Sequence, residues 1–321
     1  MRSFAIMLLC AWLLPLVTAD TAATAQLLPP HPPLRILIVS DEANPHGLPP
    51  EELTQPGEIS ATLLETAALN LDPGPDAVFE LPTDQIEDAT VLLKLPRADP
   101  AAYDVLIYFA HRIPNGADAQ ARQEAFVTAV DGFLAQGGGV ISFHHGIFLT
   151  AGKESMQDLL GAQASGTVVW DTIDGQNVIA VAPEHFIASF GIDYPATILY
   201  EDPAHGIPQD SYLFFNNTPD ERYPNFELLS AAGEIEMLFA SDYDAAPHIQ
   251  GYVERRPEWE GVGVVYQSGE YQPNALGPGN NFQILLNAIV YSALYADGEL
   301  LFSDGFESGD LGFWSQFIPG S

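Results

Sequence analysis

The stretch that decides the fold reads Gly137-Gly138-Gly139-Val140-Ile141-Ser142-Phe143-His144-His145-Gly146. Its three glycines are typical of the end of a helix, where a left-handed residue closes the last turn. The four residues from Val140 to Phe143 form a short apolar run, typical of a strand that is buried on both faces. Two histidines follow at the point where this strand ends. The stretch therefore predicts a helix, a buried strand and a polar strand end, in that order.

The same pattern recurs on both sides of this stretch. Upstream, apolar runs predict strands at 35–40, 77–81 and 103–109, and helical spacing of apolar residues predicts helices at 58–69 and 119–136. Downstream, strands are predicted at 178–181, 196–200, 235–240 and 262–268, followed by a closing helix at 281–294. Because strands alternate with helices, we expect a single α/β domain with a doubly wound parallel sheet flanked by helices.

The chain of 321 residues is strongly acidic, with 43 Asp or Glu against 10 Lys or Arg and a formal net charge of -33. A protein that binds nucleic acids or anionic membrane surfaces needs clustered Lys and Arg side chains, which this chain lacks. Both classes of partner are therefore excluded. Strong acidity is also common in disordered proteins. However, 47% of the residues are hydrophobic and 11% are aromatic, which is enough to build a core. We therefore expect a folded domain whose surface is poor in cations.

Both ends of the chain are expected to lie outside this domain. Residues 1–25 have the basic start, the apolar run and the small residues that are typical of a secretory signal peptide. A Pro-rich linker is predicted at 26–33, the domain at 34–295, and a C-terminal tail, too short to fold alone, at 296–321. The one cysteine, Cys10, lies in the signal peptide. We expect a secreted or periplasmic protein that has no thiol chemistry and no membrane insertion after cleavage.

Ionisable side chains gather at the predicted strand ends. In an open parallel sheet, ligands bind beyond the carboxyl ends of the strands, near the point where the strand order reverses. This rule selects Asp41, Glu42 and His46 after the first strand, His111 after the third, His144 and His145 after the fourth, and Glu270 after the strand at 262–268. Histidine titrates near neutrality and also binds metals, so proton transfer and metal binding are both open at this edge.

Five segments, taken together and in order, resemble the ThuA-like (trehalose-utilisation) family. They are 137–144, 103–107, Pro183-Glu184-His185-Phe186-Ile187, Gly263-Val264-Val265-Tyr266 and Asn287-Ala288-Ile289-Val290-Tyr291. The resemblance covers about residues 34–294. It implies a flavodoxin-like fold of the class I glutamine amidotransferase-like superfamily, with a sharp turn after the fourth strand. It also implies an association with sugar utilisation.

The resemblance has two chemical consequences. His144 matches the position at which amidotransferases carry their nucleophilic cysteine, and the predicted mature chain has no cysteine, so amidotransfer is excluded. Where the family usually has Gly-His after the last long strand, this chain has Gly269-Glu270. If that histidine is a base or a ligand in relatives, Glu270 is the residue that replaces it here, as a base or an oxygen ligand.

Three functional hypotheses follow. The leading one is an exported enzyme that acts on a carbohydrate or keto-sugar by acid-base chemistry of His144, Glu270 and His111, with Asp41, Glu42, His46 and His145 binding the substrate. The second is a metal-dependent hydrolase or isomerase in which His46, His111 and His144, with a carboxylate, bind a divalent cation such as zinc. The third is a sugar-binding protein that keeps the fold without the chemistry.

Overall fold

The computed structural model describes residues 31–41, 54–55, 57–167, 176–217, 220–243, 246–271, 276–277 and 279–296. The predicted signal peptide, most of the predicted linker and the tail beyond Ala296 lie outside these residues. The candidate site residues Glu42 and His46 also lie outside them. Within the described part of the chain, no helix has the length and apolar character needed to cross a membrane.

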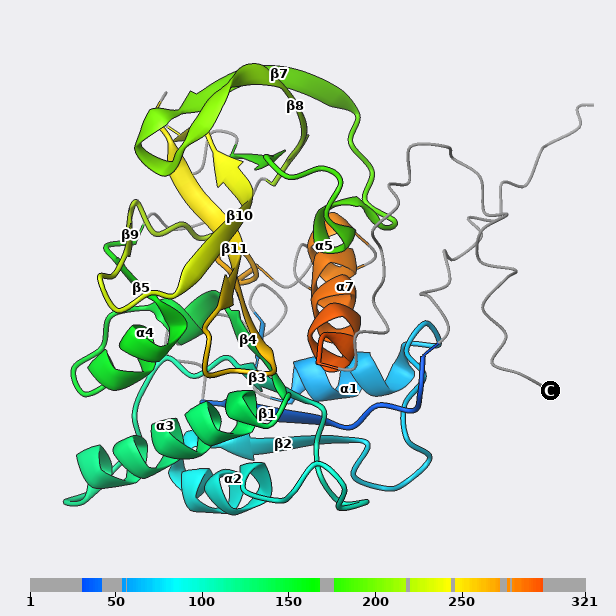
Figure 1. Ribbon diagram of the computed structural model, residues 1–321, viewed down its shortest axis with the longest axis vertical. Coiled ribbons are helices and arrows are strands. Elements are labelled where there is room, and N and C mark those ends of the chain that lie inside the picture. The colour runs from blue at the N-terminus through cyan, green and yellow to red at the C-terminus, as the bar shows by residue number, and fades with distance from the viewer. Residues whose placement is uncertain are drawn as a thin grey trace, which may run out of the picture.

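The described residues form an α/β fold around one large sheet (Figure 1). The strands of this sheet are β1 (Ile36–Ser40), β2 (Val78–Pro82), β3 (Val105–Tyr108), β4 (Gly139–Phe143), β6 (Asn177–Ala180), β7 (Ala196–Asp202), β8 (Ile207–Asn216), β10 (Glu234–Ser241), β11 (His248–Arg255) and β12 (Val262–Tyr266). A small second sheet pairs β5 (Ala162–Ser165) with β9 (Asn225–Leu228). The α-helices are α1 (Glu58–Glu65), α2 (Ile86–Leu93), α3 (Ala119–Ala135), α4 (Glu154–Leu160), α5 (Phe186–Ser189) and α7 (Asn280–Leu294).

The large sheet is mixed rather than parallel throughout. Its strands run in the order β2-β1-β3-β4-β12-β11-β10-β6-β8-β7. The neighbours from β2 to β12 pair in parallel, and those from β12 to β7 pair antiparallel. The predicted α/β class is confirmed, but the prediction of a parallel sheet is wrong for the second half. The connection 256–261 between β11 and β12 is too short for the crossover that a parallel pair requires.

Helices cover both faces of the parallel half, which explains its continuous apolar runs. On β1, Ile36 and Ile38 belong to the same core cluster as apolar residues of α1, α5 and α7. Leu37 and Val39 belong to a second cluster, with residues of α2, α3 and α4. Successive side chains of a strand point to opposite faces, so a strand with a core on each side is apolar at every position.

The three glycines before β4 allow neighbouring elements to approach closely. Gly137 ends α3 with a φ of 91°, in the left-handed region that favours glycine. A Cβ atom on Gly138 would lie 2.4 Å from the ring of Phe133, and one on Gly139 would lie 2.5 Å from the Cβ of Ser292 in α7. The close packing of α3 and α7 against the start of β4 therefore depends on these positions having no side chain.

His185, in the segment that resembles the family motif, has a structural role. Its Nδ1 accepts the backbone N–H of Ile187 at 3.2 Å and caps the short helix α5. Its ring contacts Tyr291 of α7, with 4.7 Å between the ring centroids. Burial lowers the pKa of His185 to about 4, and the nearby Glu236 opposes this shift only in part.

We predict that His185 makes the stability of the fold dependent on pH. The ordinary pKa of 6.5 applies in the unfolded chain, so the stabilisation is complete above pH 6.5 and is lost as the pH falls towards 4. Between pH 7.5 and pH 5, the wild type should lose about 2 kcal/mol more unfolding free energy than His185→Asn, whose side-chain oxygen still caps the helix. Urea unfolding at both pH values measures the difference, and equal losses in the two proteins would contradict the prediction.

Candidate metal centre

The chain turns sharply where β4 ends. His144 begins the short 3-10 helix η2 (His144–Ile147) with a φ of 41°, the one positive φ among the non-glycine residues that the structure describes. This backbone conformation costs a residue with a side chain about 1–2 kcal/mol. Gly146 makes the turn possible, because a Cβ there would lie 2.3 Å from Ser142 Oγ and 2.5 Å from the carbonyl oxygen of Tyr108. The turn directs two successive histidines to the carboxyl edge of the sheet.

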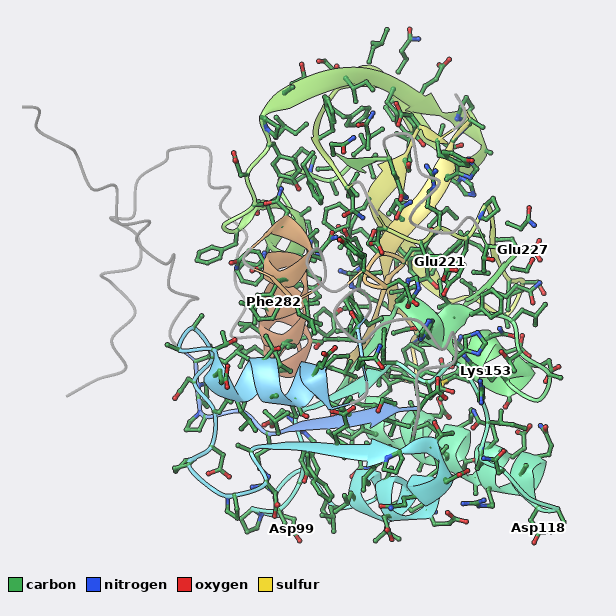
Figure 2. The ribbon with its side chains drawn as sticks, turned by 180° about the vertical axis from the view of Figure 1, so that it is seen from behind. Asp99, Asp118, Lys153, Glu221, Glu227 and Phe282 are labelled. Carbon is green, nitrogen blue, oxygen red and sulfur yellow. The ribbon has the colours of Figure 1, made fainter. Side chains whose placement is uncertain are left out.

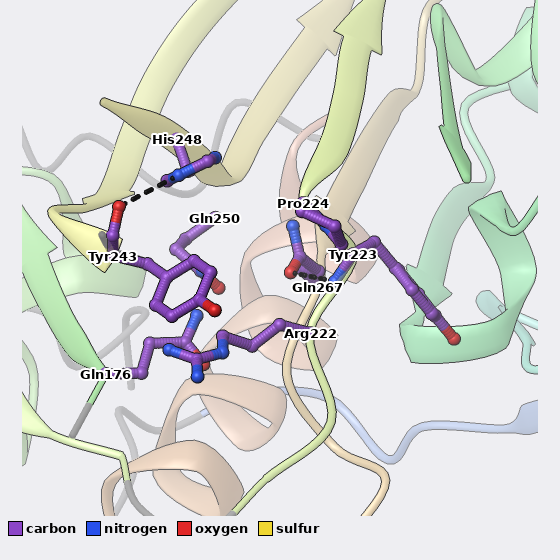
Figure 3. Close-up of a pocket in the computed structure, with 8 residues that line it drawn as sticks. All are labelled: Gln176, Arg222, Tyr223, Pro224, Tyr243, His248, Gln250 and Gln267. Atoms are coloured by element: carbon purple, nitrogen blue, oxygen red, sulfur yellow. Dashed lines mark hydrogen bonds between the residues drawn. The ribbon is translucent and has the colours of Figure 1, made fainter. Parts of the chain in front are cut away.

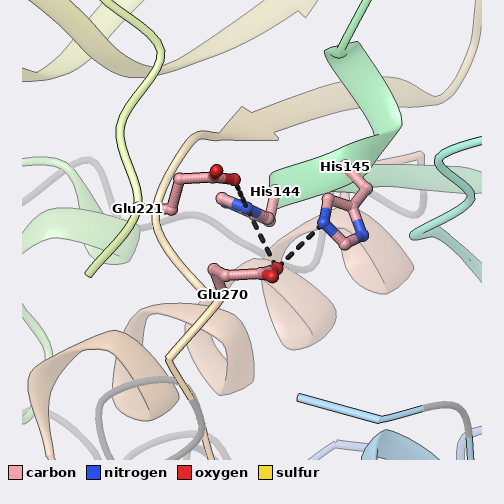
Figure 4. A group of neighbouring side chains, drawn as sticks. All are labelled: His144, His145, Glu221 and Glu270. Atoms are coloured by element: carbon pink, nitrogen blue, oxygen red, sulfur yellow. Dashed lines mark hydrogen bonds and ion pairs between the residues drawn. The ribbon is translucent and has the colours of Figure 1, made fainter. Parts of the chain in front are cut away.

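Strand β12 brings a second polar turn to the same place. It pairs in parallel with β4, and Tyr266 lies opposite Phe143. The residues that follow the two strands therefore meet, and the carbonyl oxygen of Gln267 accepts a hydrogen bond from Nδ1 of His144 at 2.7 Å. Gly269 then has a φ of 135°, and a Cβ at this position would lie 2.3 Å from the Phe143 ring. Glu270 follows, and its side chain turns back towards the histidines (Figure 4).

Four buried side chains converge at this edge: His144, His145, Glu221 and Glu270 (Figure 4). Nε2 of His144 lies 3.2 Å from Oε2 of Glu221 and 3.2 Å from Oε2 of Glu270. Nε2 of His145 lies 2.9 Å from the same oxygen of Glu270. One nitrogen or oxygen from each of the four residues lies within 4.8 Å of the others, and none of the side chains is more than 4% exposed.

The pKa values of His144, His145 and Glu270 are shifted by burial and by their charged neighbours. Burial alone would lower the pKa of His144, but hydrogen bonds to Glu221 and Glu270 outweigh burial and raise it to about 10. Burial lowers the pKa of His145, and Glu270 opposes this shift in part. Burial would raise the pKa of Glu270, but the two histidines hold it far below its usual range. The cluster therefore favours a positive charge beside these carboxylates, which either a proton or a metal cation can supply.

The donor set suits a divalent cation such as zinc. Bonds of about 2.0–2.1 Å in a tetrahedral zinc site separate the ligand atoms by about 3.3 Å. The separations of 2.9 and 3.2 Å within the cluster lie close to this value. A metal-binding histidine usually donates its other N–H to a carbonyl or carboxylate, and Nδ1 of His144 has such a partner in the Gln267 carbonyl.

Aromatic rings enclose the cluster. Tyr223 stacks on His144 with 4.9 Å between the ring centroids, and its hydroxyl oxygen lies 3.0 Å from His144 Nε2. Phe109 stacks on His145 at 4.9 Å. Burial, with a contribution from the negative charge of Glu221, raises the pKa of Tyr223 well above its ordinary value. Tyr223 therefore stays protonated and can offer an O–H donor to the cluster.

Lys153, labelled in Figure 2, lies at the N-terminus of α4 and contacts the histidine turn. The side chain is fully buried, and Nζ donates to the carbonyl oxygens of Ala110 at 2.7 Å and His145 at 2.9 Å. Burial lowers its pKa to about 7, and the negative charge of Asp41 opposes this shift. Lys153 thus joins the ends of β3 and β4 through backbone carbonyl groups.

A small pocket is lined in part by Tyr223 and Gln267, two residues that also contact His144 (Figure 3). Eight residues line it: Gln176, Arg222, Tyr223, Pro224, Tyr243, His248, Gln250 and Gln267. The Arg222 guanidinium lies 3.4 Å above the Tyr243 ring, whereas the Tyr223 side chain points away from both (Figure 3). The space suffices for about one water molecule and not for a sugar.

The structure brings together three of the predicted site residues, His144, His145 and Glu270. His111 lies beside the cluster, with its ring 5.1 Å from that of His145, but it is not one of the converging donors. Asp41 accepts the backbone N–H groups of His111 and Arg112 at 2.8 and 3.2 Å, so it stabilises the loop after β3.

The position of the cluster also differs from the prediction in one respect. It lies at the carboxyl edge of the parallel strands, as expected, but at β4 and β12 rather than at β1 and β3, between which the strand order reverses. The reason is that the acidic partners come from the turn after β12 and from the segment 220–224 before β9, both of which lie on the β4 side.

Glu221 and Tyr223 were not among the sequence candidates. They lie in the segment 220–224, outside any strand or helix of the parallel half. No spacing rule distinguishes Glu221 among the 43 Asp and Glu residues of the chain. Glu221 is one of the few buried carboxylates, and its burial depends on contacts with residues far away in the chain, such as His144.

We predict that the turn at 144–147 does not tolerate a side chain at Gly146. Gly146→Ala should lower the unfolding free energy by about 1–3 kcal/mol, because its methyl group would overlap a backbone oxygen and a buried hydroxyl. Gly132→Ala is the control, since Gly132 lies in α3 with no atom near its Cβ position, and it should raise stability by about 0.5–1 kcal/mol. Equal effects of the two substitutions in urea unfolding would refute the prediction.

Comparisons with known proteins return matches among solved structures alone. No family model matches the sequence, and no curated protein matches it. The fold is similar to that of a protein described as ThuA-like from Bacteroides uniformis, with 13% identity over 83% of this chain and 92% of that one and a TM-score of 0.47. A second protein described as ThuA-like, from Parabacteroides merdae, has 9% identity over 82% and 90% of the two chains and a TM-score of 0.49.

A protein described as cytoplasmic, from Salmonella typhimurium, is similar over 81% of this chain and 99% of that one, with 10% identity and a TM-score of 0.44. The ThuA-like resemblance expected from the sequence motifs therefore recurs among the structural matches.

Proposed function

We propose that this protein is a metal-dependent enzyme that acts on a carbohydrate or keto-sugar. One divalent cation such as zinc would be bound by His144, His145, Glu221 and Glu270. The observation that carries the proposal is the convergence of one donor atom from each of these four buried residues within 4.8 Å. The ligand set expected from the sequence was His46, His111 and His144 with a carboxylate. In the proposed set His145 is added, Glu221 and Glu270 are the carboxylates, and His111 lies beside the site, whereas His46 lies outside the described residues.

Charge balance favours a divalent cation over a single proton. If only His144 is protonated, two carboxylates share one positive charge in a site that is nearly closed to solvent. Buried charge without compensation is costly. A divalent cation neutralises both carboxylates and leaves both histidines neutral, which is the form in which imidazole binds metals.

The substrate class and the location rest on the sequence. The ThuA-like motifs support a sugar or a sugar derivative as substrate, and the predicted signal peptide supports export. The order β2-β1-β3-β4-β12, with helices on both faces, supports a flavodoxin-like, doubly wound arrangement of the parallel half. In such folds, ligands bind beyond the carboxyl ends of the strands, where this cluster lies.

The arrangement suits hydrolysis, isomerisation or elimination. A divalent cation held by these four residues would take a sugar oxygen or a water molecule as a fifth ligand, and would then polarise the sugar's carbonyl or hydroxyl group or lower the pKa of the water. The hydroxyl group of Tyr223, 3.0 Å from His144 Nε2, is placed to donate a hydrogen bond to a substrate oxygen. His111, whose ring contacts that of His145, is the candidate proton carrier at the side of the site.

A second candidate is the metal-free acid-base enzyme. The ion pairs that Glu270 makes with His144 and His145, at 3.2 and 2.9 Å, favour it, because such a set can also pass protons to a sugar directly. The two candidates differ in one measurable property, the requirement for a cation.

We predict that protein purified without an affinity tag and dialysed against zinc retains about one equivalent of metal. Glu221→Gln should lose most of it, because the amide removes a charged ligand. Glu227→Gln, at an exposed position on β9, is the matched control and should bind as the wild type does. Wild-type protein with less than about a tenth of an equivalent would refute the metal centre.

We predict that turnover of sugars and keto-sugars, followed by NMR, stops in the presence of a chelator and returns when zinc is added. His144→Ala should lower turnover by about 100-fold or more, and His205→Ala, in the turn between β7 and β8, should not. Turnover that resists the chelator but needs His144 would favour the metal-free candidate. Sugar binding without any product would show that the protein is not an enzyme.

A further inference from the structure

A third buried carboxylate, that of Asp220, lies next to the two that face the cluster. Its Oδ1 accepts the backbone N–H groups of Glu270 at 3.1 Å and Tyr271 at 3.0 Å, and its Oδ2 accepts that of Gly269 at 3.0 Å. The side chain is fully buried. Three consecutive amides of the turn after β12 therefore converge on one side chain.

The same carboxylate also holds the segment that carries Glu221. Oδ1 of Asp220 accepts the backbone N–H of Glu221 at 2.9 Å. Asn217 donates its side-chain amide to Oδ2 at 3.1 Å, and Asn281 of α7 donates to Asn217 at 2.7 Å. Asp220 thus connects both acidic turns to each other and, through Asn217, to the closing helix.

The turn after β12 is held from the other side by Thr54. The backbone N–H of Thr54 donates to the carbonyl oxygen of Glu270 at 2.8 Å, and its hydroxyl donates to that of Gly269 at 3.0 Å. Buried backbone groups need partners, and here the amide groups of the turn bind Asp220 while two of its carbonyl groups bind Thr54. Gly269 contributes no stiffness of its own, because its φ of 135° is one that glycine adopts freely.

We propose that Asp220 is the positioning residue of the metal centre. By fixing both the backbone of Glu270 and that of Glu221, it sets the separation of the two carboxylate ligands and so the affinity for the cation. Asp220 is not itself a ligand, because it does not belong to the group of converging donor atoms and its oxygens are engaged by N–H groups. The inference rests on the proposed function in taking Glu221 and Glu270 as metal ligands.

Asp220→Asn tests the inference, because asparagine has nearly the same volume but replaces one acceptor oxygen by an NH2 group, which faces the amides as a second donor. The affinity for zinc, measured by competition with a chromophoric chelator, should fall by about 10–100-fold. The absorption spectrum of the cobalt-loaded variant should also change, since it reports the ligand geometry.

Asp202→Asn is the matched control. Asp202 is 1% exposed and also accepts two backbone N–H groups, those of Ala204 and His205, but it lies in the turn between β7 and β8. Both substitutions should lower the melting temperature, whereas only Asp220→Asn should lower zinc affinity. If Asp220 had a purely structural role, both folded variants would bind zinc with the affinity of the wild type.

The outcomes separate the two proposals. Wild-type protein that binds no zinc overturns the metal centre itself. Equal zinc affinity of wild type and Asp220→Asn overturns the role of Asp220 alone. If Asp220→Asn does not fold, hydrogen exchange of the wild-type protein is the test. The backbone amides of residues 269–271 should exchange slowly, because each donates to a buried acceptor, and rapid exchange would overturn the inference.

Discussion

The parallel pairing of β4 with β12 is the constraint on which the site depends. Tyr266 lies opposite Phe143, so the turns that follow the two strands begin side by side. The hydrogen bond from His144 to the Gln267 carbonyl then joins them and directs Nε2 towards the carboxylates. A shift of this register by one residue would turn each side chain of the strand to the opposite face and separate the histidines from Glu270.

Buried negative charge is the second constraint. Asp220, Glu221 and Glu270 lie within two neighbouring turns, and all three are nearly inaccessible to solvent. The charge of Asp220 is compensated by backbone and amide N–H groups, whereas the carboxylates of Glu221 and Glu270 face histidines. In the two proposals, the first arrangement fixes the turns and the second binds a cation.

The strongly apolar or periodic elements could be predicted from the sequence, and the weaker ones could not. The predictions for β1, β4, α3 and α7 agree with the structure to within about two residues at each end, a normal uncertainty for such boundaries. Strands β8 and β11 were missed because polar and charged residues interrupt them, as in Ile207-Pro208-Gln209-Asp210. These segments form strands because they pair with neighbouring strands, and such pairing leaves little alternation of apolar and polar residues in the sequence of one strand.

Three of the four candidate ligands, His144, His145 and Glu270, were among the sequence candidates, because each follows closely on an apolar strand whose end is clear. The contribution of Glu221 to the cluster could not be predicted, since its segment has no periodic pattern and it is one of many acidic residues. The strongly negative net charge was evident from composition, but its distribution was not. Only tertiary structure decided which carboxylates are buried, because burial depends on contacts between residues far apart in the chain, such as those of Asp220 with the turn at 269–271.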